Sequence, residues 1–333
     1  MVHETYWQRL AHVMTMGSRD PFAQNLPPSH RLRVGFSWSI KPEYACFYFA
    51  QQHGYYSSAG LSIEFRPGNG AESALQVLRS GGIDLLVLPC PFAVSAIQGG
   101  APVKIMALYQ QVAPVCLVSH DDCPVRHPRD LEGKAVAMLL GETGTAFLEH
   151  FCQKNAVDYE KVGRRNTRPQ DKLDAFRRRD VDVISVYRTN ELPILKSSLE
   201  NSLAELDLAA FGLKIPGMCI VTTDTLLDEQ PQILRRFLQA TSNATAAALT
   251  KRLQLQTVAQ ALCNHDNEAD IVRQQLDAFV GSLSRDTTAP FGFCDDRMIN
   301  AYLAETGVAL AGRPCRYTAH LEPEDIDGHG SAC

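Results

Sequence analysis

The stretch spanning residues 33–102 constrains the fold most, because strand-like and helix-like segments alternate along it at short spacing. In chain order these segments cover residues 33–38, 45–53, 62–65, 72–79 and 83–88. Gly54 ends the first helical segment, and Gly81-Gly82 ends the second. Strands joined through a helix run parallel, since a crossover connection is needed to return to the same end of the sheet. The alternation therefore predicts an α/β fold with a parallel sheet.

The remaining chain continues this pattern and is long enough for two lobes. Strand-like runs at 103–108 and 115–119 extend the first lobe, and the polar stretch 120–129 is interpreted as the crossing into the second. The segment 211–217 is interpreted as the return crossing. The predicted division is a leader at 1–30, lobe one at 31–120 plus 218–311, lobe two at 121–217, and a loosely held tail at 312–333.

Composition narrows the partners that this chain can have. The 333 residues are 45% hydrophobic and 21% charged, which is typical of a soluble globular protein. The net charge of -5 argues against a nucleic-acid partner. Arginines cluster at 164–165 and 177–179, and a solvated helix face is favoured over a binding patch. No apolar run approaches the roughly 20 residues needed for a transmembrane segment.

The N-terminal stretch and the cysteines bear on the cellular compartment. Residues 1–30 show no continuous apolar core followed by a small-residue cleavage site, so no secretory signal is visible. The ten cysteines are scattered, without a CxxC motif or metal-ligand spacing. This usage predicts no metal site and fits a reducing compartment. The expected location is cytoplasmic as sequenced, with a periplasmic location as the alternative if a signal was removed.

Candidate binding residues are sought directly after each strand, because ligands of open parallel sheets lie at the carboxyl ends of strands. Two lobes with two crossings leave a cleft where those ends meet. Trp38 and Tyr44 follow the first strand, and their rings can stack on a flat ligand while offering a polar edge. The alternative is that Trp38 only closes the hinge side of the core.

A glycine- and threonine-containing turn follows the strand 135–140 and precedes a helix. Its residues are Gly141, Glu142, Thr143, Gly144 and Thr145. Free amides at a helix start, together with the threonine hydroxyls, can hold an anion. The turn is not a P-loop, because the lysine and the spacing are missing. The alternative is an ordinary helix cap with a glycine turn.

Two further stretches follow strands. Cys90 and Phe92 come after the strand 83–88. Cys90 is a catalytic candidate, but a weak one, because no histidine is near it in the sequence. Phe92 is expected to pack against a ligand. Tyr187, Arg188 and Glu191 follow the strand 181–186. Arg188 can bind an anionic ligand through its guanidinium, unless Glu191 holds it in a local ion pair.

The order and spacing of several short motifs resemble a known family. The matching positions are Trp38, Phe47, Ala50, Gly54-Tyr55-Tyr56, Gly60-Leu61, Ser80-Gly81 with Asp84, Gly99 with Pro102, and residues 130–134. They resemble the substrate-binding proteins of nitrate/sulfonate/taurine-type ABC transporters, a family that includes the fungal thiamin pyrimidine-precursor synthases. The resemblance covers about residues 31–300. It implies a two-lobed periplasmic-binding-protein-like (type II) fold, with a ligand between the lobes and contacts at 141–145.

This sequence departs from the enzymes of that family at the positions that carry their chemistry. The synthases hold pyridoxal phosphate on a lysine where this chain has Leu88, and their following histidine falls on Phe92. Their cysteine-rich cluster falls on 214–219, where only Cys219 is a cysteine. A related desulfinase has its nucleophilic cysteine near the position of Ser39. We therefore expect no cofactor.

Two functions remain as hypotheses. The first is binding of a small organic anion, or of a phosphorylated or sulfonated heterocycle, as a transporter-type substrate-binding protein whose further partner is an ABC permease. The second is a cytoplasmic enzyme on the same scaffold, acting on a small heteroaromatic or sulfur-containing substrate. Fold alone does not decide between them.

Overall fold

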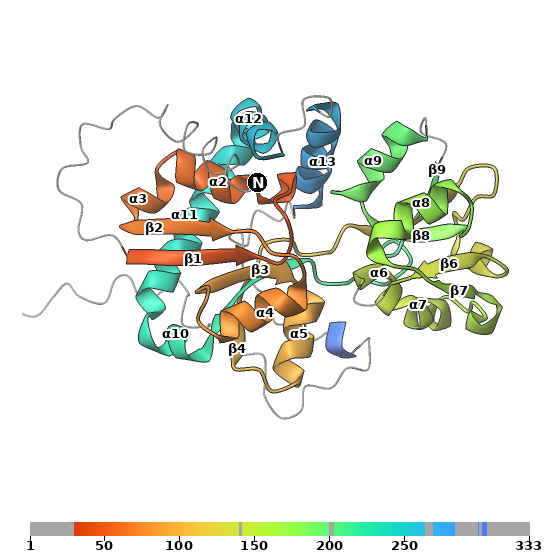
Figure 1. The fold of residues 1–333 in the computed structure, drawn as a ribbon, viewed down its shortest axis with the longest axis horizontal. Coiled ribbons are helices and arrows are strands. Elements are labelled where there is room, and N and C mark those ends of the chain that lie inside the picture. The colour runs from red at the N-terminus through yellow and green to blue at the C-terminus, as the bar shows by residue number, and fades with distance from the viewer. Residues whose placement is uncertain are drawn as a thin grey trace, which may run out of the picture.

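The computed structural model describes residues 30–139, 142–199, 203–263, 269–283, 299 and 302–304. Two α/β lobes lie side by side, and the chain crosses between them twice (Figure 1). The leader and tail expected at 1–30 and 312–333 lie outside the described residues, except for His30, which begins β1.

The first lobe contains a five-stranded sheet in the order β2-β1-β3-β10-β4. β1 pairs in parallel with β2 and β3, as the alternation in sequence predicts, whereas β10 runs antiparallel between β3 and β4. The strands are β1 (His30–Phe36), β2 (Leu61–Arg66), β3 (Leu85–Pro89), β4 (Val103–Leu108) and β10 (Met218–Thr223).

Helices cover both faces of this sheet, so its strands are apolar on both sides. Side chains of β3 alternate: Leu85 and Val87 join the core beneath α2 and α11, and Leu86 and Leu88 join the core beneath α4 and α5. The helical elements are η2 (Pro42–Tyr44), α2 (Ala45–Gln52), α3 (Tyr55–Ser58), α4 (Ala71–Arg79), α5 (Cys90–Gln98), α10 (Asp224–Glu229), α11 (Pro231–Thr250), α12 (Arg252–Cys263) and α13 (Ala269–Ser282).

The second lobe contains a five-stranded sheet in the order β7-β6-β8-β5-β9. Its strands are β5 (Val115–His120), β6 (Ala135–Met138), β7 (Gly163–Asn166), β8 (Val183–Tyr187) and β9 (Leu203–Asp207). Its helical elements are η3 (Pro128–Leu131), α6 (Thr143–Ala146), α7 (Leu148–Lys154), η4 (Tyr159–Lys161), η5 (Pro169–Asp171), α8 (Lys172–Arg177) and α9 (Glu191–Ser198).

The placement of β5 corrects the boundary expected between residues 120 and 121. Every residue of β5 is buried, and the strand pairs antiparallel with both β8 and β9 of the second sheet. A strand buried on both faces reads the same whichever sheet accepts it, so its sequence does not reveal its lobe. The first crossing therefore lies in residues 109–114, before β5, and the polar stretch 120–129 belongs wholly to the second lobe.

The two crossing segments run side by side as a short antiparallel ribbon. Val112 bridges to Pro216, and the N–H of Ala113 donates to the carbonyl of Ile215 at 2.8 Å. A Cβ at Gly217 would lie 2.4 Å from the carbonyl oxygen of Gln110, so only glycine permits this approach. The ribbon is the covalent connection between the lobes.

Both lobes anchor their central strands with one aspartate. The N–H of Arg33 in β1 donates to Asp84 Oδ2 at 2.7 Å, and the N–H of Asp84 donates back to the carbonyl of Arg33 at 2.8 Å. In the second lobe Asp182 makes the same pair of hydrogen bonds with Ala135 of β6, at 2.7 and 2.8 Å. The two lobes thus repeat one structural unit, although the sequence shows no obvious internal repeat.

We expect Asp84→Ala to lower the free energy of unfolding by about 2–3 kcal/mol. The change removes the acceptor of the Arg33 N–H and the partner of the Arg33 guanidinium, whose Nη2 lies 2.6 Å from Oδ1. Asp121→Ala is the matched control, because its ion pair with Arg126 is exposed and is expected to contribute under about 1 kcal/mol. Urea denaturation measures both, and equal losses would contradict the anchoring role.

Candidate functional site

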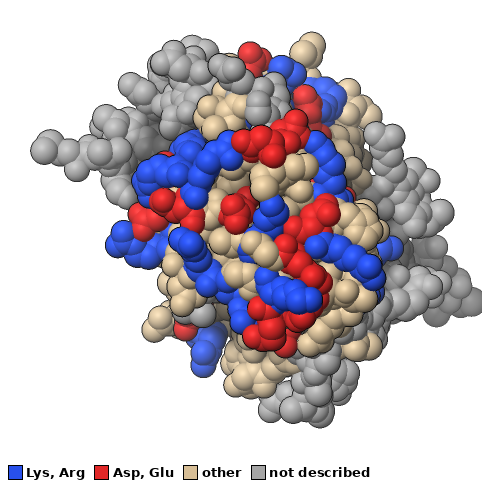
Figure 2. All heavy atoms as spheres, turned by 90° about the vertical axis from the view of Figure 1, so that its right-hand side faces the viewer, with Lys and Arg blue, Asp and Glu red and all other residues tan. Residues whose placement is uncertain are grey.

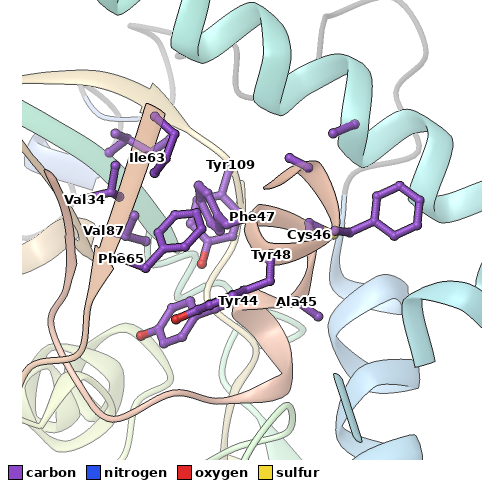
Figure 3. Packing of buried hydrophobic residues seen from close by; sticks show 14 of the residues in the cluster. Val34, Tyr44, Ala45, Cys46, Phe47, Tyr48, Ile63, Phe65, Val87 and Tyr109 are labelled. Carbon is purple, nitrogen blue, oxygen red and sulfur yellow. The ribbon is translucent and has the colours of Figure 1, made fainter. Parts of the chain in front are cut away.

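A stack of aromatic rings fixes the loop that follows β1. Phe36, the last residue of β1, stacks on Tyr44 with a centroid separation of 4.2 Å, and Tyr48 lies 4.5 Å from Phe65. Figure 3 shows Tyr44 and Tyr48 beside the rings of Phe47 and Phe65. Tyr44 is 1% exposed, so its ring is part of this core. The stack fixes Tyr44, the last residue of η2, and thereby positions Glu43, which directly precedes Tyr44.

Glu43 links the first lobe to the second. The hydroxyl of Thr189, which follows β8, donates to Glu43 Oε2 at 3.2 Å, and both residues are buried. Burial raises the pKa of Glu43, and nearby Glu191 adds to the rise, while Lys41 and the Thr189 hydrogen bond oppose it. A second contact between the lobes lies beside this one, where Gln275 of α13 donates to the carbonyl of Asn190 at 2.8 Å.

Lys172 is the buried cation of the second lobe. Its Nζ donates to Glu142 Oε1 at 2.6 Å, to the carbonyl of Ser185 at 2.9 Å and to Glu191 Oε1 at 3.3 Å. An ammonium group has three protons, and all three are used. Burial lowers the pKa of Lys172, but Glu191 and Glu142 outweigh burial, so the net pKa is raised and the group stays charged.

The two carboxylates around Lys172 titrate differently. Burial raises the pKa of Glu142, and Lys172 only partly offsets this. Burial also acts to raise the pKa of Glu191, but there the attraction of Lys172 and Lys41 prevails, and the pKa is lowered. Glu191 is further held by the N–H of Tyr187, which donates to its Oε2 at 3.0 Å. Glu191 is therefore the carboxylate that stays ionised to lower pH.

The structure brings together two of the stretches singled out in the sequence. The hydroxyl of Tyr187 donates to Thr143 Oγ1 at 2.9 Å, and the hydroxyl of Thr145 donates to Glu142 Oε2 at 3.2 Å. Lys172 then joins Glu142 to Glu191. The turn after β6 and the turn after β8 thus form one polar network, which we call the junction cluster together with Glu43, Thr189 and Lys41.

Gly144 has a packing role in this cluster. A Cβ there would lie 1.8 Å from Ser185 Oγ and 2.8 Å from Val115 Cγ1, so glycine is needed for α6 to approach β8 and β5. The helix that begins here spans four residues. Gly141, the first residue of the expected turn, lies outside the described residues.

Arg188 points away from the junction cluster and towards β9. Its Nη1 donates to Asp207 Oδ2 at 2.6 Å, and its Nε donates to Glu205 Oε2 at 3.2 Å. Its carboxylate partners are therefore these two residues rather than Glu191, which binds Lys172. Two carboxylates already neutralise the guanidinium that was expected to bind an anionic ligand.

The residues after β3 belong to an apolar core, whereas Trp38 lies at the edge of the junction cluster. Cys90 is fully buried at the start of α5, and Phe92 packs half-buried against the same apolar core. Leu88 is fully buried as well. Trp38 is 45% exposed, and Lys41 Nζ lies 5.9 Å from its ring centroid. Trp38 therefore keeps an open aromatic face next to the charged groups.

Four members of the junction cluster were missed from the sequence: Lys41, Glu43, Lys172 and Thr189. Lys172 begins α8, and Asp174 and the three arginines at 177–179 follow it closely, so this stretch has the pattern of a solvated surface. Glu43 directly precedes the aromatic candidate Tyr44 in the sequence, and Thr189 directly follows the candidate Arg188. Position after a strand was the available signal, and it applied to every residue of the turn, not only to the aromatic ones.

The surface of the second lobe carries many charges of both signs. Figure 2 shows Lys and Arg interspersed with Asp and Glu over this face. The arginine runs take part in ion pairs: Arg164 with Glu160, Arg177 with Asp174, Arg178 with Asp180, and Arg179 with Asp122. Such neutralised arginines fit a solvated face.

The part of the chain that the structure describes holds neither a metal site nor a membrane-spanning helix. Within the described ranges, no three histidine, cysteine or carboxylate side chains gather as a metal site. None of the helices described there has the length and apolar character needed to cross a membrane. The seven cysteines that the structure describes are free thiols.

Comparison with known proteins agrees with this architecture. The riboflavin-binding protein RibY of Chloroflexus aurantiacus is 23% identical over 270 residues, covering 78% of this chain and 70% of RibY. The periplasmic aliphatic sulphonate binding protein SsuA of Escherichia coli superposes with a TM-score of 0.66 at 15% identity, covering 84% of this chain and 86% of SsuA. The periplasmic nitrate-binding protein NrtA of Synechocystis PCC 6803 gives 0.54 at 14% identity, covering 71% and 67%.

These features define a two-lobed protein with the periplasmic-binding-protein fold. The chain belongs to the family described as NMT1/THI5 like, whose model matches residues 41–252. The fold and the family relationship expected from the sequence are thereby confirmed.

Lys172→Met should lower the free energy of unfolding at pH 7 by about 3–5 kcal/mol, because Glu142 and Glu191 would lose their buried counter-charge. The pKa of Glu191 is lowered from its ordinary value of 4.5 in the folded protein, so its ionised carboxylate stabilises the fold at pH values above 4.5. This stabilisation is lost as the pH falls through the lowered pKa. The gap between variant and parent should therefore narrow towards pH 4. Lys161→Met, at an exposed lysine, is the control. Urea titrations at both pH values measure the gap, and a loss no larger than the control's would contradict this account.

Gly144→Ala should lower the free energy of unfolding by about 1–3 kcal/mol, because the added methyl group overlaps Ser185 and Val115. Gly281→Ala is a matched control in α13, where an added Cβ meets nothing within 4 Å. That change should raise the free energy of unfolding by about 0.5–1 kcal/mol, since alanine favours helix over glycine. Denaturation midpoints separate the two, and a neutral Gly144→Ala would refute the packing role.

Proposed function

We propose that this protein is a substrate-binding protein of the ABC-transporter type, and that it holds a small organic molecule where the two lobes meet. The observation that carries the proposal is the junction cluster. The ends of β1, β6 and β8 bring buried charged and aromatic groups to the same place, and Thr189 contacts Glu43 across the lobes. Buried ionisable groups gathered at a domain junction are typical of ligand sites.

The relatives support this role by their descriptions. RibY is described as binding riboflavin and SsuA as binding aliphatic sulphonates, so proteins similar to this chain bind quite different small organic molecules. The further partner would be the membrane component that receives the ligand. This role favours the periplasmic location over the cytoplasmic one, because such a protein works on the side from which substrate is taken up.

Closure of the lobes would provide the mechanism. The ribbon at Val112 and Pro216 leaves the lobes joined by two strands, about which they can rotate. A ligand shifts this equilibrium only if it binds the closed form better than the open one. A ligand that contacts Glu43 from one lobe and Thr189 from the other would meet this requirement.

An enzyme on the same scaffold is the second candidate. The raised pKa values of Glu43 and Glu142, both caused chiefly by burial, are a feature that active sites share. Cys90 gives this candidate little support, because its side chain is buried in the core next to α5. Recovery of a chemically changed ligand after incubation would favour the enzyme.

The binding role predicts stabilisation and compaction by a ligand. A thermal-shift screen should include riboflavin, thiamin precursors, alkanesulfonates, nitrate and small aromatic acids. At 100 times its dissociation constant, a ligand should add about 2.7 kcal/mol to the free energy of unfolding. Small-angle scattering should then show a smaller radius of gyration, and mass spectrometry should recover the ligand unchanged. Absence of both stabilisation and compaction across the screen would refute the proposal.

A further inference from the structure

We propose that closing the two lobes takes up a proton at Glu43, so that mild acid favours the closed form. The proposal rests on the proposed function, because it concerns how the lobe movement of a binding protein is regulated. The device would act already in the protein without ligand. Its basis is a buried carboxylate that lies where the lobes touch and whose surroundings change when they separate.

Glu43 lies at the contact between the lobes. Its side chain belongs to η2 of the first lobe, is 6% exposed, and accepts a hydrogen bond of 3.2 Å from Thr189 of the second lobe. Beside it, α13 packs against both η2 and α9, and Gln275 of α13 donates to the carbonyl of Asn190 (Figure 1). Separation of the lobes would break both hydrogen bonds and admit water to the carboxylate of Glu43.

The second lobe also brings a negative charge towards Glu43. Burial is the main cause of the raised pKa of Glu43, and the carboxylate of Glu191, kept ionised by Lys172, adds to the rise. Lys41 and the Thr189 hydroxyl oppose that rise without cancelling it. Lys41 belongs to the first lobe, two residues before Glu43, so its attraction acts in the open form too. Glu191 and part of the burial come from the second lobe, so closure strengthens both of these influences.

Glu142 is the other carboxylate of the junction cluster with a raised pKa. The hydrogen-bond partners of its carboxylate are Lys172 and Thr145, which lie in the same lobe as Glu142 itself. Rotation of the lobes leaves these contacts intact, so the proton affinity of Glu142 changes little. Among the contacts that the structure describes, Glu43 is the carboxylate of the cluster that bonds across the lobes.

The other titratable groups around Glu43, on the elements packed against it, fall into two sets. The first set consists of phenols and thiols, which are uncharged in the acid range: Tyr44, Tyr48, Tyr109, Tyr187, Cys46 and Cys263. Burial raises the pKa of Cys46 and of Cys263 to about 12. The second set consists of charged groups on α12 and α13, which form ion pairs with one another: Arg252 with Asp277, and Arg273 with Asp270. Neither set replaces Glu43 as the group that titrates at the contact.

The direction of the pH effect depends on which form binds the proton more tightly. In the closed form the pKa of Glu43 lies above its ordinary value of 4.5, and in the open form, where water reaches the carboxylate, it returns towards 4.5. Protonation therefore favours closure as the pH falls through the raised pKa, and the gain is complete below 4.5. Above the raised pKa, closure must bury an ionised carboxylate. A pKa difference of 1 between the two forms changes the ratio of closed to open protein about 10-fold.

Small-angle scattering of the ligand-free full chain between pH 8 and pH 4.5 tests the proposal, with size-exclusion chromatography in line to remove aggregates. We expect the radius of gyration of the parent to decrease as the pH falls, while the far-ultraviolet circular dichroism stays unchanged. Glu43→Gln replaces the carboxylate with an uncharged group of the same shape, so this variant should be compact at every pH. Glu72→Gln, on an exposed part of α4, should keep the pH dependence of the parent.

The outcomes separate proton-linked closure from the proposed function. If the parent keeps one radius across the pH range, or if Glu43→Gln compacts with acid as the parent does, proton-linked closure is wrong. The binding role still stands in that case if a ligand of the screen stabilises and compacts the protein. If acid compacts the parent but not Glu43→Gln, and no ligand of the screen binds, proton-linked closure stands and the binding role falls.

Thr189→Val tests the same contact should Glu43→Gln fail to fold. The change removes the hydroxyl that donates to Glu43 across the lobes, and an ionised carboxylate loses more by this than a protonated one. The variant should therefore be more extended than the parent at pH 8 and should still compact as the pH falls. Thr257→Val, at an exposed position of α12, is the matched control and should behave like the parent. A Thr189→Val protein with the parent's radius at every pH would overturn the proposal.

Discussion

The ion cluster of Lys172 with Glu142 and Glu191 is the interaction on which one edge of the second lobe depends. It joins the turn after β6, the end of β8 and the start of α9 through a single ammonium group. Buried charges of this kind cost desolvation energy and are stable only as a complete set. Their geometry is therefore tightly coupled, so that a change at one member affects the others.

The first lobe offers a stiffer partner. Its loop after β1 is fixed by the stack of Phe36 on Tyr44, and this loop holds Glu43 against Thr189. The lobes are joined by a ribbon whose close approach requires Gly217. A small rotation at the ribbon would change the distance between Glu43 and Thr189 while leaving each lobe's core intact. Recognition and closure would then depend on the same few atoms.

Several arginines of the second lobe have carboxylate partners close by. Arg178 pairs with Asp180, Arg179 with Asp122 and Arg188 with Asp207, and Figure 2 shows the two signs intermixed on this face. A guanidinium paired in this way contributes little net field.

The sequence by itself determined the α/β class, the two lobes, the return of β10 to the first sheet and the family, because these follow from hydrophobic periodicity and from motif order along the chain. It also placed Glu142, Tyr187 and Glu191 after their strands. Only the tertiary structure assigned β5 to the second lobe and paired Arg188 with β9. It alone brought Lys172 and Glu43 into the junction cluster. Local pattern records whether a residue faces water or core, whereas the partner of a charge depends on chain segments distant in sequence.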